Sequence, residues 1–339
     1  MIKKKSQLRF GLIGCGDIGI INSRAVAEAE LSRLVVCADL DKSLAKSLGT
    51  RYDIPYVKNA IEVFESKDVD VVFLCTPPFT HAPLASEAFA NGKHVITEKP
   101  MSNNLASANE MIAASRKARK KLSICFAERY QPYVRESKIL IDNGILGNIF
   151  GTQLLFHHDM IENYWTRGFS GASLSNWRGS KIQSGGGILA ANLVHFLDVI
   201  RYLTGLEVVQ SHSSYDTFDT PVEVEDSLVA TYRYDNGALG SINGFNCVRG
   251  TEYLFDFRIW GTNGHISLSK PLRFYSLKNI SGYKPGRWHE IKTEVGNARA
   301  DFVQDFCRAL LNDQDVPVSG EDGKVIQTLV ESFYSAKHR

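Results

Sequence analysis

A glycine-rich turn between a strand-like run and a helix-like run places the strongest constraint on the fold. The apolar run Leu8–Ile13 is typical of a buried strand, and residues 14–19 read Gly-Cys-Gly-Asp-Ile-Gly. In this pattern the first glycine makes a tight turn, the second lets the backbone approach a pyrophosphate, and the third lets the helix pack closely on the strand. The sequence therefore predicts a βαβ unit whose helix N-terminus attracts a dinucleotide. The expected contacts in this turn are Gly14, Gly16, Asp17, Ile18 and Gly19.

An acidic residue follows the second predicted strand at the distance that such a unit requires. The apolar run Leu34–Ala38 ends in Asp39, which lies about 20 residues beyond Gly19. A carboxylate at this position accepts hydrogen bonds from a free ribose 2′-hydroxyl and repels a 2′-phosphate. We therefore expect NAD to be the preferred cofactor, with NADP still possible because Lys42 could contact a phosphate.

Strand-like and helix-like runs continue to alternate as far as residue 126. The further predicted strands are 56–57, 69–75, 95–97 and 122–126, and the predicted helices are 42–48, 60–65, 81–90 and 102–118, with Thr80 and Ser102 as the caps of the last two. Alternation of this kind builds a doubly wound parallel sheet of the Rossmann type. We assign this α/β dinucleotide-binding domain to residues 1–126.

Charged and rigid residues gather where two of these strands end. In an open α/β sheet, ligands bind beyond the carboxyl ends of the strands, and Glu98 and Lys99 lie there, before Pro100 ends the strand pairing. A rigid Thr-Pro-Pro turn follows the fourth strand at the same edge, with a histidine just after it. For this histidine, cofactor contact and local packing are equally compatible with the pattern. The candidate cofactor contacts at this edge are Thr76, Pro77, His81, Glu98 and Lys99.

Beyond residue 147 the pattern changes to longer strands with hairpin turns. The predicted strands are 148–157, 208–217, 227–234 and 254–260, with Asn236-Gly237 and Asn263-Gly264 as turns. We expect residues 127–339 to form an α+β domain with a largely antiparallel, open sheet, whose last helix could pack back on the first domain. The bulky residues Phe255, Phe257 and Ile259 suggest that the sheet's uncovered face meets a second subunit, in a homodimer or homotetramer.

A glycine run at residues 184–187 precedes a helical run that ends at Gly205. The apolar positions at helical spacing are Leu189, Leu193, Phe196, Ile200 and Leu203. His195 lies off this stripe and shares a polar face with Asn192 and Asp198, near a backbone that can be approached closely. The pattern alone is compatible with a structural histidine as well as with substrate contact.

Aromatic and basic residues precede the glycine run in an irregular segment. Tyr164, Arg167, Trp177 and Arg178 could bind a sugar hydroxyl, a carboxylate or a phosphate, and loop packing explains them equally well. Residues 157–159, His-His-Asp, are of metal-binding types, but adjacent strand residues point to opposite faces and no spaced partner follows. We therefore expect no metal site.

Composition restricts the partners of the chain. There are 39 basic and 37 acidic residues, so the net charge of +2 offers no field for a nucleic acid or an anionic membrane, and a small molecule is favoured. The first apolar run is too short for a secretory or membrane segment. The six cysteines include no CxxC pair and indicate reduced core thiols. A cytosolic location is the expectation.

Together these stretches resemble the glucose-fructose oxidoreductase and inositol dehydrogenase (Gfo/Idh/MocA) family. The matching residues are 14–19, 75–81, 98–100, 184–187 with His195 and Asp198, and 318–323. The resemblance implies a nicotinamide-binding domain, a sheet domain that often mediates dimers or tetramers, and hydride transfer at a carbinol carbon of a sugar, polyol or nucleotide-sugar-like substrate. It matches Glu98-Lys99-Pro100 to the family's catalytic-lysine motif. Arg129, after the sixth predicted strand, completes the expected cofactor contacts.

The chain departs from the family pattern at one position of the second motif. Many members carry an Asp four residues before the histidine, where this chain has Ala191, and that Asp acts with the histidine on substrate hydroxyls. Asn192 is the nearest polar substitute in sequence. We therefore expect Lys99 to move the hydroxyl proton, with His195 as the second candidate. The alternative from another functional class is a non-catalytic nicotinamide-dependent sensor, which would need neither Lys99 nor His195.

Overall fold

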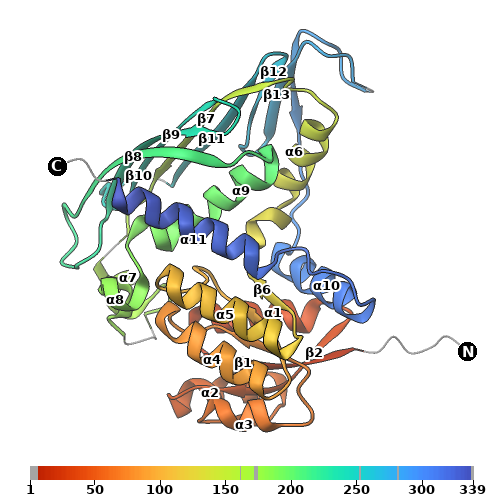
Figure 1. Cartoon of the computed structure of the whole chain (residues 1–339), viewed down its shortest axis with the longest axis vertical. Coiled ribbons are helices and arrows are strands. Elements are labelled where there is room, and N and C mark those ends of the chain that lie inside the picture. Colours follow the sequence, from red (N-terminus) through yellow and green to blue (C-terminus); the bar gives the residue numbers. More distant parts are fainter. Residues whose placement is uncertain (1–6, 161, 172–174, 252, 281, 337–339) are drawn as a thin grey trace, which may run out of the picture. The chain divides into compact units, whose positions relative to one another are not determined.

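The computed structural model describes residues 7–160, 162–171, 175–251, 253–280 and 282–336 (Figure 1). Its contacts divide the chain into two compact units. The first unit contains residues 1–127, 163–185 and 299–328, and the second contains residues 128–162, 186–298 and 329–339. The single domain boundary expected after residue 126 stays a prediction, since the contact-based units are assembled from several segments each.

The first unit is built on a parallel sheet. Its strands are β1 (Leu8–Ile13), β2 (Ser32–Ala38), β3 (Tyr56–Val57), β4 (Val71–Leu74), β5 (His94–Thr97) and β6 (Leu122–Ile124). Within the described residues their order is β3-β2-β1-β4-β5-β6, and every neighbouring pair is parallel. The order reverses between β1 and β4, which is where a doubly wound sheet binds its ligand. The predicted Rossmann-type sheet is confirmed.

The first unit also contains helices. They are α1 (Asp17–Glu28), α2 (Lys42–Tyr52), α3 (Ala60–Glu65), α4 (Pro78–Ala90), α5 (Leu105–Ala118), α7 (Glu162–Arg167), α8 (Lys181–Ser184) and α10 (Ala298–Leu311). Helix α10 packs on the sheet through Phe306, whose ring centroid lies 6.5 Å from that of Phe10. The first half of α11 (Gly320–Ser335) also belongs here: a Cβ at Gly323 would lie only 2.6 Å from Ile124. The end of the chain therefore contributes to the core of the first unit.

Two of the predicted helix caps are wrong. Helix α4 begins at Pro78, three residues before the predicted start, because proline at the first helical position needs no N–H partner. The hydroxyl of Thr80 instead lies inside the first turn, 2.7 Å from the carbonyl oxygen of Pro77. Helix α5 is capped by Asn104, whose side chain accepts the Ser107 N–H, while Ser102 bonds to the carbonyl of Asn104.

The second unit is built on a mixed sheet. Its strands are β7 (Ile149–His157), β8 (Val208–Asp216), β9 (Ser227–Tyr234), β10 (Leu239–Phe245), β11 (Leu254–Gly261), β12 (Gly264–Ser267), β13 (Leu272–Ser276) and β14 (Arg287–Ile291). Their order is β14-β13-β12-β11-β7-β10-β9-β8 in the described part of the chain. Only the β7–β10 pair is parallel among these neighbours. This confirms the predicted, largely antiparallel sheet.

Helices α6 (Pro132–Asp142) and α9 (Val194–Thr204) belong to this unit, and α9 covers one face of the sheet (Figure 1). Phe196 of α9 packs against Phe255, with ring centroids 4.6 Å apart. Phe257 and Ile259 are fully buried. Because alternate strand residues share a face, all three bulky residues belong to the face that α9 covers and give no support to the expected subunit contact. That contact stays a prediction.

The structure shows the burial of the most apolar helical stretch and of the cysteines among the described residues. One helical stretch, Lys181–Thr204, is long and apolar enough to cross a membrane, but 72% of its most apolar window is buried inside the structure, as in a core helix. Of the six cysteines, all are free thiols and only Cys247 is not buried. The prediction of core thiols is confirmed for five of them and is wrong for Cys247.

Candidate functional site

The glycine turn after β1 has the close contacts that its sequence predicts. Gly14 has a φ of +94°, and a Cβ there would lie 2.6 Å from the carbonyl oxygen of Cys75. A Cβ at Gly19 would lie 2.0 Å from the carbonyl oxygen of Gly14, so this position requires glycine. Gly16 is the N-cap of α1. Because glycine has no side chain to bond to the first-turn N–H groups, these groups stay accessible to an anion. Ile18 lies in the same first turn.

Asp39 lies at the end of β2 beside this turn. Its Oδ2 accepts the N–H of Cys15 at 2.7 Å, and its Oδ1 accepts the N–H of Asp41 at 2.8 Å. The carboxylate is thereby oriented toward the glycine turn that follows β1. Asp17, in the first turn of α1, accepts hydrogen bonds from the backbone and the hydroxyl of Ser170. The glycine cradle and the oriented acid fit a dinucleotide.

Glu98 and Lys99 follow β5, and Glu98 lies in a buried polar cluster of the first unit. Its Oε1 accepts from Asn22 Nδ2 at 2.8 Å and from Arg299 Nη1 at 2.5 Å, and its Oε2 accepts the Lys99 N–H at 3.1 Å. Burial opposes ionisation of Glu98, but the charges of Arg299 and Lys99 hold its pKa below the ordinary value. Lys99 itself is half-buried, and its bond to Pro100 is cis.

His81 joins the turn after β4 to the turn after β5. Its Nε2 lies 2.7 Å from the carbonyl oxygen of Thr76, and its Nδ1 lies 3.2 Å from the carbonyl oxygens of both Pro100 and Met101. The side chain is fully buried, and burial lowers its pKa. His81 therefore fixes the two strand-end turns against each other. Contact of His81, Thr76 or Pro77 with the cofactor stays a prediction.

Three of the four predicted aromatic and basic contacts lie together in the first unit. The guanidinium of Arg178 stands 5.4 Å from the ring centroid of Tyr164 and 4.6 Å from that of Trp177. Tyr164 is buried and packs on Phe169 at 4.8 Å. Arg167, at the end of α7, is exposed. The cluster has both a charged fork and aromatic faces, and its role in substrate binding stays a prediction.

In the second unit, the glycine run before α9 packs against the protein's own atoms. A Cβ at Gly186 would lie 1.8 Å from the Tyr334 hydroxyl, and one at Gly187 would lie 1.9 Å from the Glu225 carbonyl. The carboxylate of Glu225 accepts the N–H groups of Gly187 and Leu189 at 2.9 and 3.1 Å and the Tyr334 hydroxyl at 2.7 Å. The close approach expected here is thus explained by helix capping.

The helix that carries His195 begins with a π-helical turn, Leu189–Leu193, which contains Ala191 and Asn192. The side chain of Asn192 accepts a hydrogen bond from buried Asn246 at 2.9 Å. The predicted apolar stripe of this helix is confirmed, since all five of its members are buried. His195 is partly exposed.

Asp198 is fully buried and takes part in a bidentate ion pair. Arg129 donates Nε and Nη2 to its two oxygens at 2.7 and 2.6 Å. The Arg129 side chain is only 8% exposed. This pair gives Arg129 a structural role in the second unit, and its expected contact with the cofactor stays a prediction.

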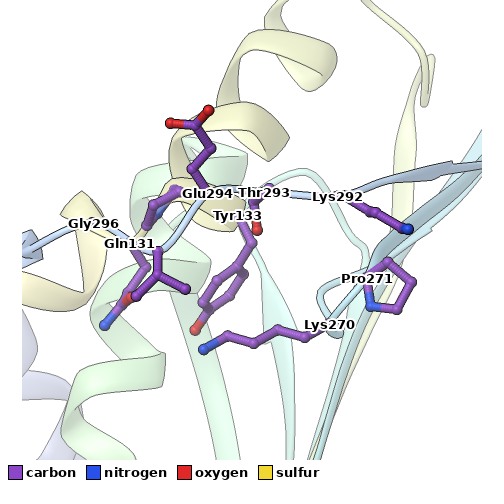
Figure 2. A pocket seen from close by; sticks show the side chains of 10 residues that line it. Gln131, Tyr133, Lys270, Pro271, Lys292, Thr293, Glu294 and Gly296 are labelled. Carbon is purple, nitrogen blue, oxygen red and sulfur yellow. The ribbon is translucent and has the colours of Figure 1, made fainter.

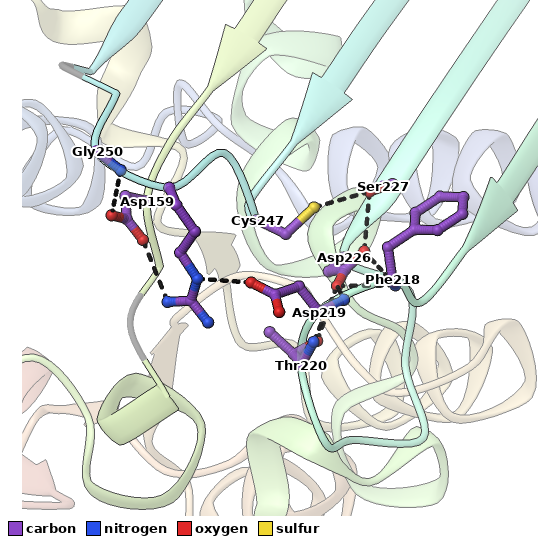
Figure 3. Close-up of polar contacts among 9 residues, drawn as sticks. Asp159, Phe218, Asp219, Thr220, Asp226, Ser227, Cys247 and Gly250 are labelled. Atoms are coloured by element: carbon purple, nitrogen blue, oxygen red, sulfur yellow. Dashed lines mark hydrogen bonds and ion pairs between the residues drawn. The ribbon is translucent and has the colours of Figure 1, made fainter.

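The segment with metal-type residues is held by loop contacts (Figure 3). Asp159 accepts the Gly250 N–H at 2.8 Å and lies 3.4 Å from Arg249, which also pairs with Asp219. His157 Nε2 lies 2.7 Å from the side-chain oxygen of Asn243. The described ranges contain no cluster of three or more metal-ligating side chains. The absence of a metal stays a prediction.

A cavity of about 330 Å³ opens in the second unit at the start of α6 (Figure 2). Lys270 lies beside it with its ammonium 5.6 Å from the Tyr133 ring centroid. Its lining residues are Gln131, Pro132, Tyr133, Lys270, Pro271 and 292–296. None of the residues that the sequence predicts for the site lines this cavity.

Three residues of these clusters were not predicted from sequence. Asn22 could have been recognised from sequence, because it is a polar residue at helical spacing from Gly19 and Val26. The face of α1 that carries these three residues is buried. Arg299 and Glu225 gave none, because their partners lie far away in the chain.

The fold and the cradle around Gly14, Gly19 and Asp39 define a dinucleotide-binding domain, and comparisons with known proteins identify its family. The model of an oxidoreductase family with an NAD-binding Rossmann fold matches residues 8–126, and that of the GFO/IDH/MocA C-terminal domain matches residues 134–267. The chain therefore belongs to the Gfo/Idh/MocA family, as its motifs indicated, and is an NAD-binding oxidoreductase.

Relatives align over nearly the whole chain. Inositol 2-dehydrogenase of Rhizobium meliloti is 25% identical, over 96% of this chain and 95% of that protein. Myo-inositol 2-dehydrogenase of Thermotoga maritima is 26% identical, over 97% of this chain and 95% of that protein. Among solved structures, levoglucosan dehydrogenase in complex with NADH has a TM-score of 0.86 at 24% identity. The match covers 98% of this chain and 97% of that chain, so the two proteins share the fold. Aldose-aldose oxidoreductase from Caulobacter crescentus, complexed with glycerol, has a TM-score of 0.84 at 25% identity, with coverage of 97% of each chain.

Proposed function

We propose that this enzyme transfers a hydride between NAD and a carbinol carbon of a sugar, a polyol or a nucleotide-sugar-like substrate. The observation that carries the proposal is Lys99, which lies at the carboxyl end of β5 and is tethered through its N–H to the buried Glu98 carboxylate. The relatives named inositol 2-dehydrogenase, myo-inositol 2-dehydrogenase and levoglucosan dehydrogenase support the substrate class.

The residues of the chain have separate tasks in this proposal. The N–H groups in the first turn of α1 bind the pyrophosphate, and Asp39 accepts the ribose hydroxyls. When bound, NAD accepts or returns the hydride at its nicotinamide ring. Lys99 removes the substrate hydroxyl proton during oxidation and returns it during reduction, for which it must be neutral at the start of oxidation. His195 is the second candidate for this task.

The substrate contacts remain part of the proposal. An arginine fork binds paired oxygens and an aromatic face packs on a sugar ring, which are the groups that the Arg178 cluster offers. Asn192 and His195 offer an amide and an imidazole group that can bond to substrate hydroxyls. The proposed contacts are Tyr164, Arg167, Trp177, Arg178, Asn192 and His195.

A substrate screen tests the reaction. Purified protein with NAD⁺ is mixed with sugars, polyols and nucleotide sugars, and the absorbance of the reduced nicotinamide is followed. We expect turnover with at least one of these compounds, and Lys99→Met should abolish most of it. Tight NAD⁺ binding without turnover on any compound would instead favour a sensor.

The choice of cofactor gives a sharp prediction for Asp39. NAD(H) should bind more tightly than NADP(H), because the Asp39 carboxylate accepts ribose hydroxyls and repels a 2′-phosphate. Asp39→Ala should reduce the difference between the affinities for NAD(H) and NADP(H). Asp41→Ala, at the N-cap of α2, is the matched control. Binding is measured by nicotinamide fluorescence titration. Tighter binding of NADP(H) by the native protein would contradict the assignment.

We also propose that the enzyme is a homo-oligomer assembled through the uncovered face of the second sheet. Exposed apolar residues of this face include Val229, Leu239 and Trp288, which are 44%, 55% and 49% exposed. Light scattering at micromolar concentration should give at least a dimer. Leu239→Asp should shift the mass toward a monomer, whereas Ile139→Asp on α6 should not. A monomer mass for the native protein would refute the proposal.

The proposed location is the cytosol. Free thiols persist in a reducing compartment, and all six cysteines of this chain are unpaired. The small net charge gives no reason to expect a nucleic acid or a membrane as partner.

A further inference from the structure

The buried polar cluster behind Lys99 contains a cation that the reaction itself does not use. Arg299 enters the first unit at the start of α10, and its side chain is 20% exposed, against 4% for that of Glu98. Its Nη1 reaches Glu98 Oε1 at 2.5 Å, Asn22 Oδ1 at 2.7 Å and Cys125 Sγ at 3.3 Å. Arg299 is thus a direct counter-charge of the buried Glu98 carboxylate.

Glu98 connects this cation to Lys99. One oxygen of its carboxylate is taken by Arg299 and Asn22, and the other accepts the backbone N–H of Lys99 at 3.1 Å. The carboxylate therefore links the backbone of Lys99 to Arg299 and Asn22. A buried carboxylate that loses its cation must rotate toward another positive group or take up a proton. The nearest other positive group in the sequence is the Lys99 ammonium.

We propose that Arg299 is a positioning residue for the reaction: it neutralises and orients Glu98, and so sets the place and the charge state of Lys99. This inference rests on the proposed role of Lys99 and adds a residue about 200 positions away in the chain. While Arg299 is present, the Glu98 charge is compensated, and Lys99 can lose its proton more readily. Without Arg299, the same carboxylate stabilises the Lys99 ammonium.

The test measures the charge state of Lys99 directly, without relying on turnover. The full chain is acetylated with trace acetic anhydride at a series of pH values, with and without NAD⁺, and the labelling of the Lys99 peptide is quantified by mass spectrometry. Lys58, which is exposed, is the internal standard. Arg299→Met should raise the pH midpoint of Lys99 labelling by about one unit. Arg299→Lys, which keeps the charge, should restore most of the native midpoint.

Two further variants separate positioning from simple anchoring of α10. Glu98→Gln should lower the Lys99 midpoint, because Arg299 then lacks its counter-charge, and Glu98→Gln with Arg299→Met should return it toward the native value. Arg308→Met, which removes an exposed pair with Asp305 on the same helix, should leave it unchanged. If Arg299 only anchored α10, all variants would show the same pH midpoint of Lys99 labelling. That result would overturn the proposal.

Turnover distinguishes this inference from the proposed function. With the substrate found in the screen, Arg299→Met should lower kcat about 10- to 100-fold with little change in NAD⁺ affinity, and the basic limb of its pH profile should shift with the labelling midpoint. If Arg299→Met does not fold, Arg299→Lys and Glu98→Gln still carry the test. If labelling shifts as expected while Lys99→Met keeps its turnover, the positioning of Lys99 stands and its role as the proton carrier is wrong.

Discussion

Lys99→Met should lower kcat by about 10²- to 10⁴-fold, the usual contribution of one acid-base group. Methionine keeps the length and most of the apolar stem of lysine and removes only the ammonium. His195→Ala should cost at least about tenfold less. The reason is that Lys99 lies on the strand end that the dinucleotide-binding sheet presents to its ligand, whereas His195 lacks the acidic neighbour that position 191 supplies in many family members.

Both variants are compared by steady-state kinetics at saturating NAD⁺, with the substrate that the screen provides. Nicotinamide fluorescence should show that cofactor binding survives each change. Lys58→Met, at an exposed lysine of the first unit, is the matched control and should leave kcat unaltered. If His195→Ala proves the more damaging change while Lys99→Met keeps most of its turnover, the imidazole is the proton carrier.

Arg129→Met should destabilise the second unit by about 3–5 kcal/mol, because it removes the guanidinium that forms two bonds to a buried carboxylate. Asp198 is fully buried, and Arg129 donates two charge-compensating bonds to it at 2.7 and 2.6 Å. Methionine fills part of the volume but offers no donor. In urea unfolding followed by circular dichroism, the midpoint of the transition should move to a lower urea concentration.

The matched variants show whether the effect comes from the unpaired charge. Arg129→Met combined with Asp198→Leu should recover much of the lost stability, since no buried charge remains. Arg201→Met removes a more exposed pair with Glu207 and should cost only about 0–1 kcal/mol. A small loss of stability in Arg129→Met together with weakened NAD⁺ binding would mean that Arg129 mainly serves the cofactor.

Local sequence was sufficient for the first sheet and for the glycine turn that follows its first strand. Gly14 has a positive φ, and a Cβ at Gly19 would clash with the backbone of Gly14, so local backbone geometry calls for glycine at both positions. Asp39 is placed by the length of one βαβ unit. Such features depend on neighbours in sequence, and each was predicted with its residue number. The boundaries of helices were less certain, since Pro78 and Asn104 took the roles expected of Thr80 and Ser102.

By itself, then, the sequence determined the doubly wound sheet, the dinucleotide cradle and the position of Lys99 at a strand end, because periodicity and glycine conformation act over a few residues. Only the tertiary structure decided that Arg299 compensates Glu98, that Glu225 caps the helix of His195, and that Phe257 faces that helix rather than the open side of its sheet. The physical reason is that buried charges and sheet faces are satisfied by whichever segments the fold brings together, and those segments lie far apart along the chain.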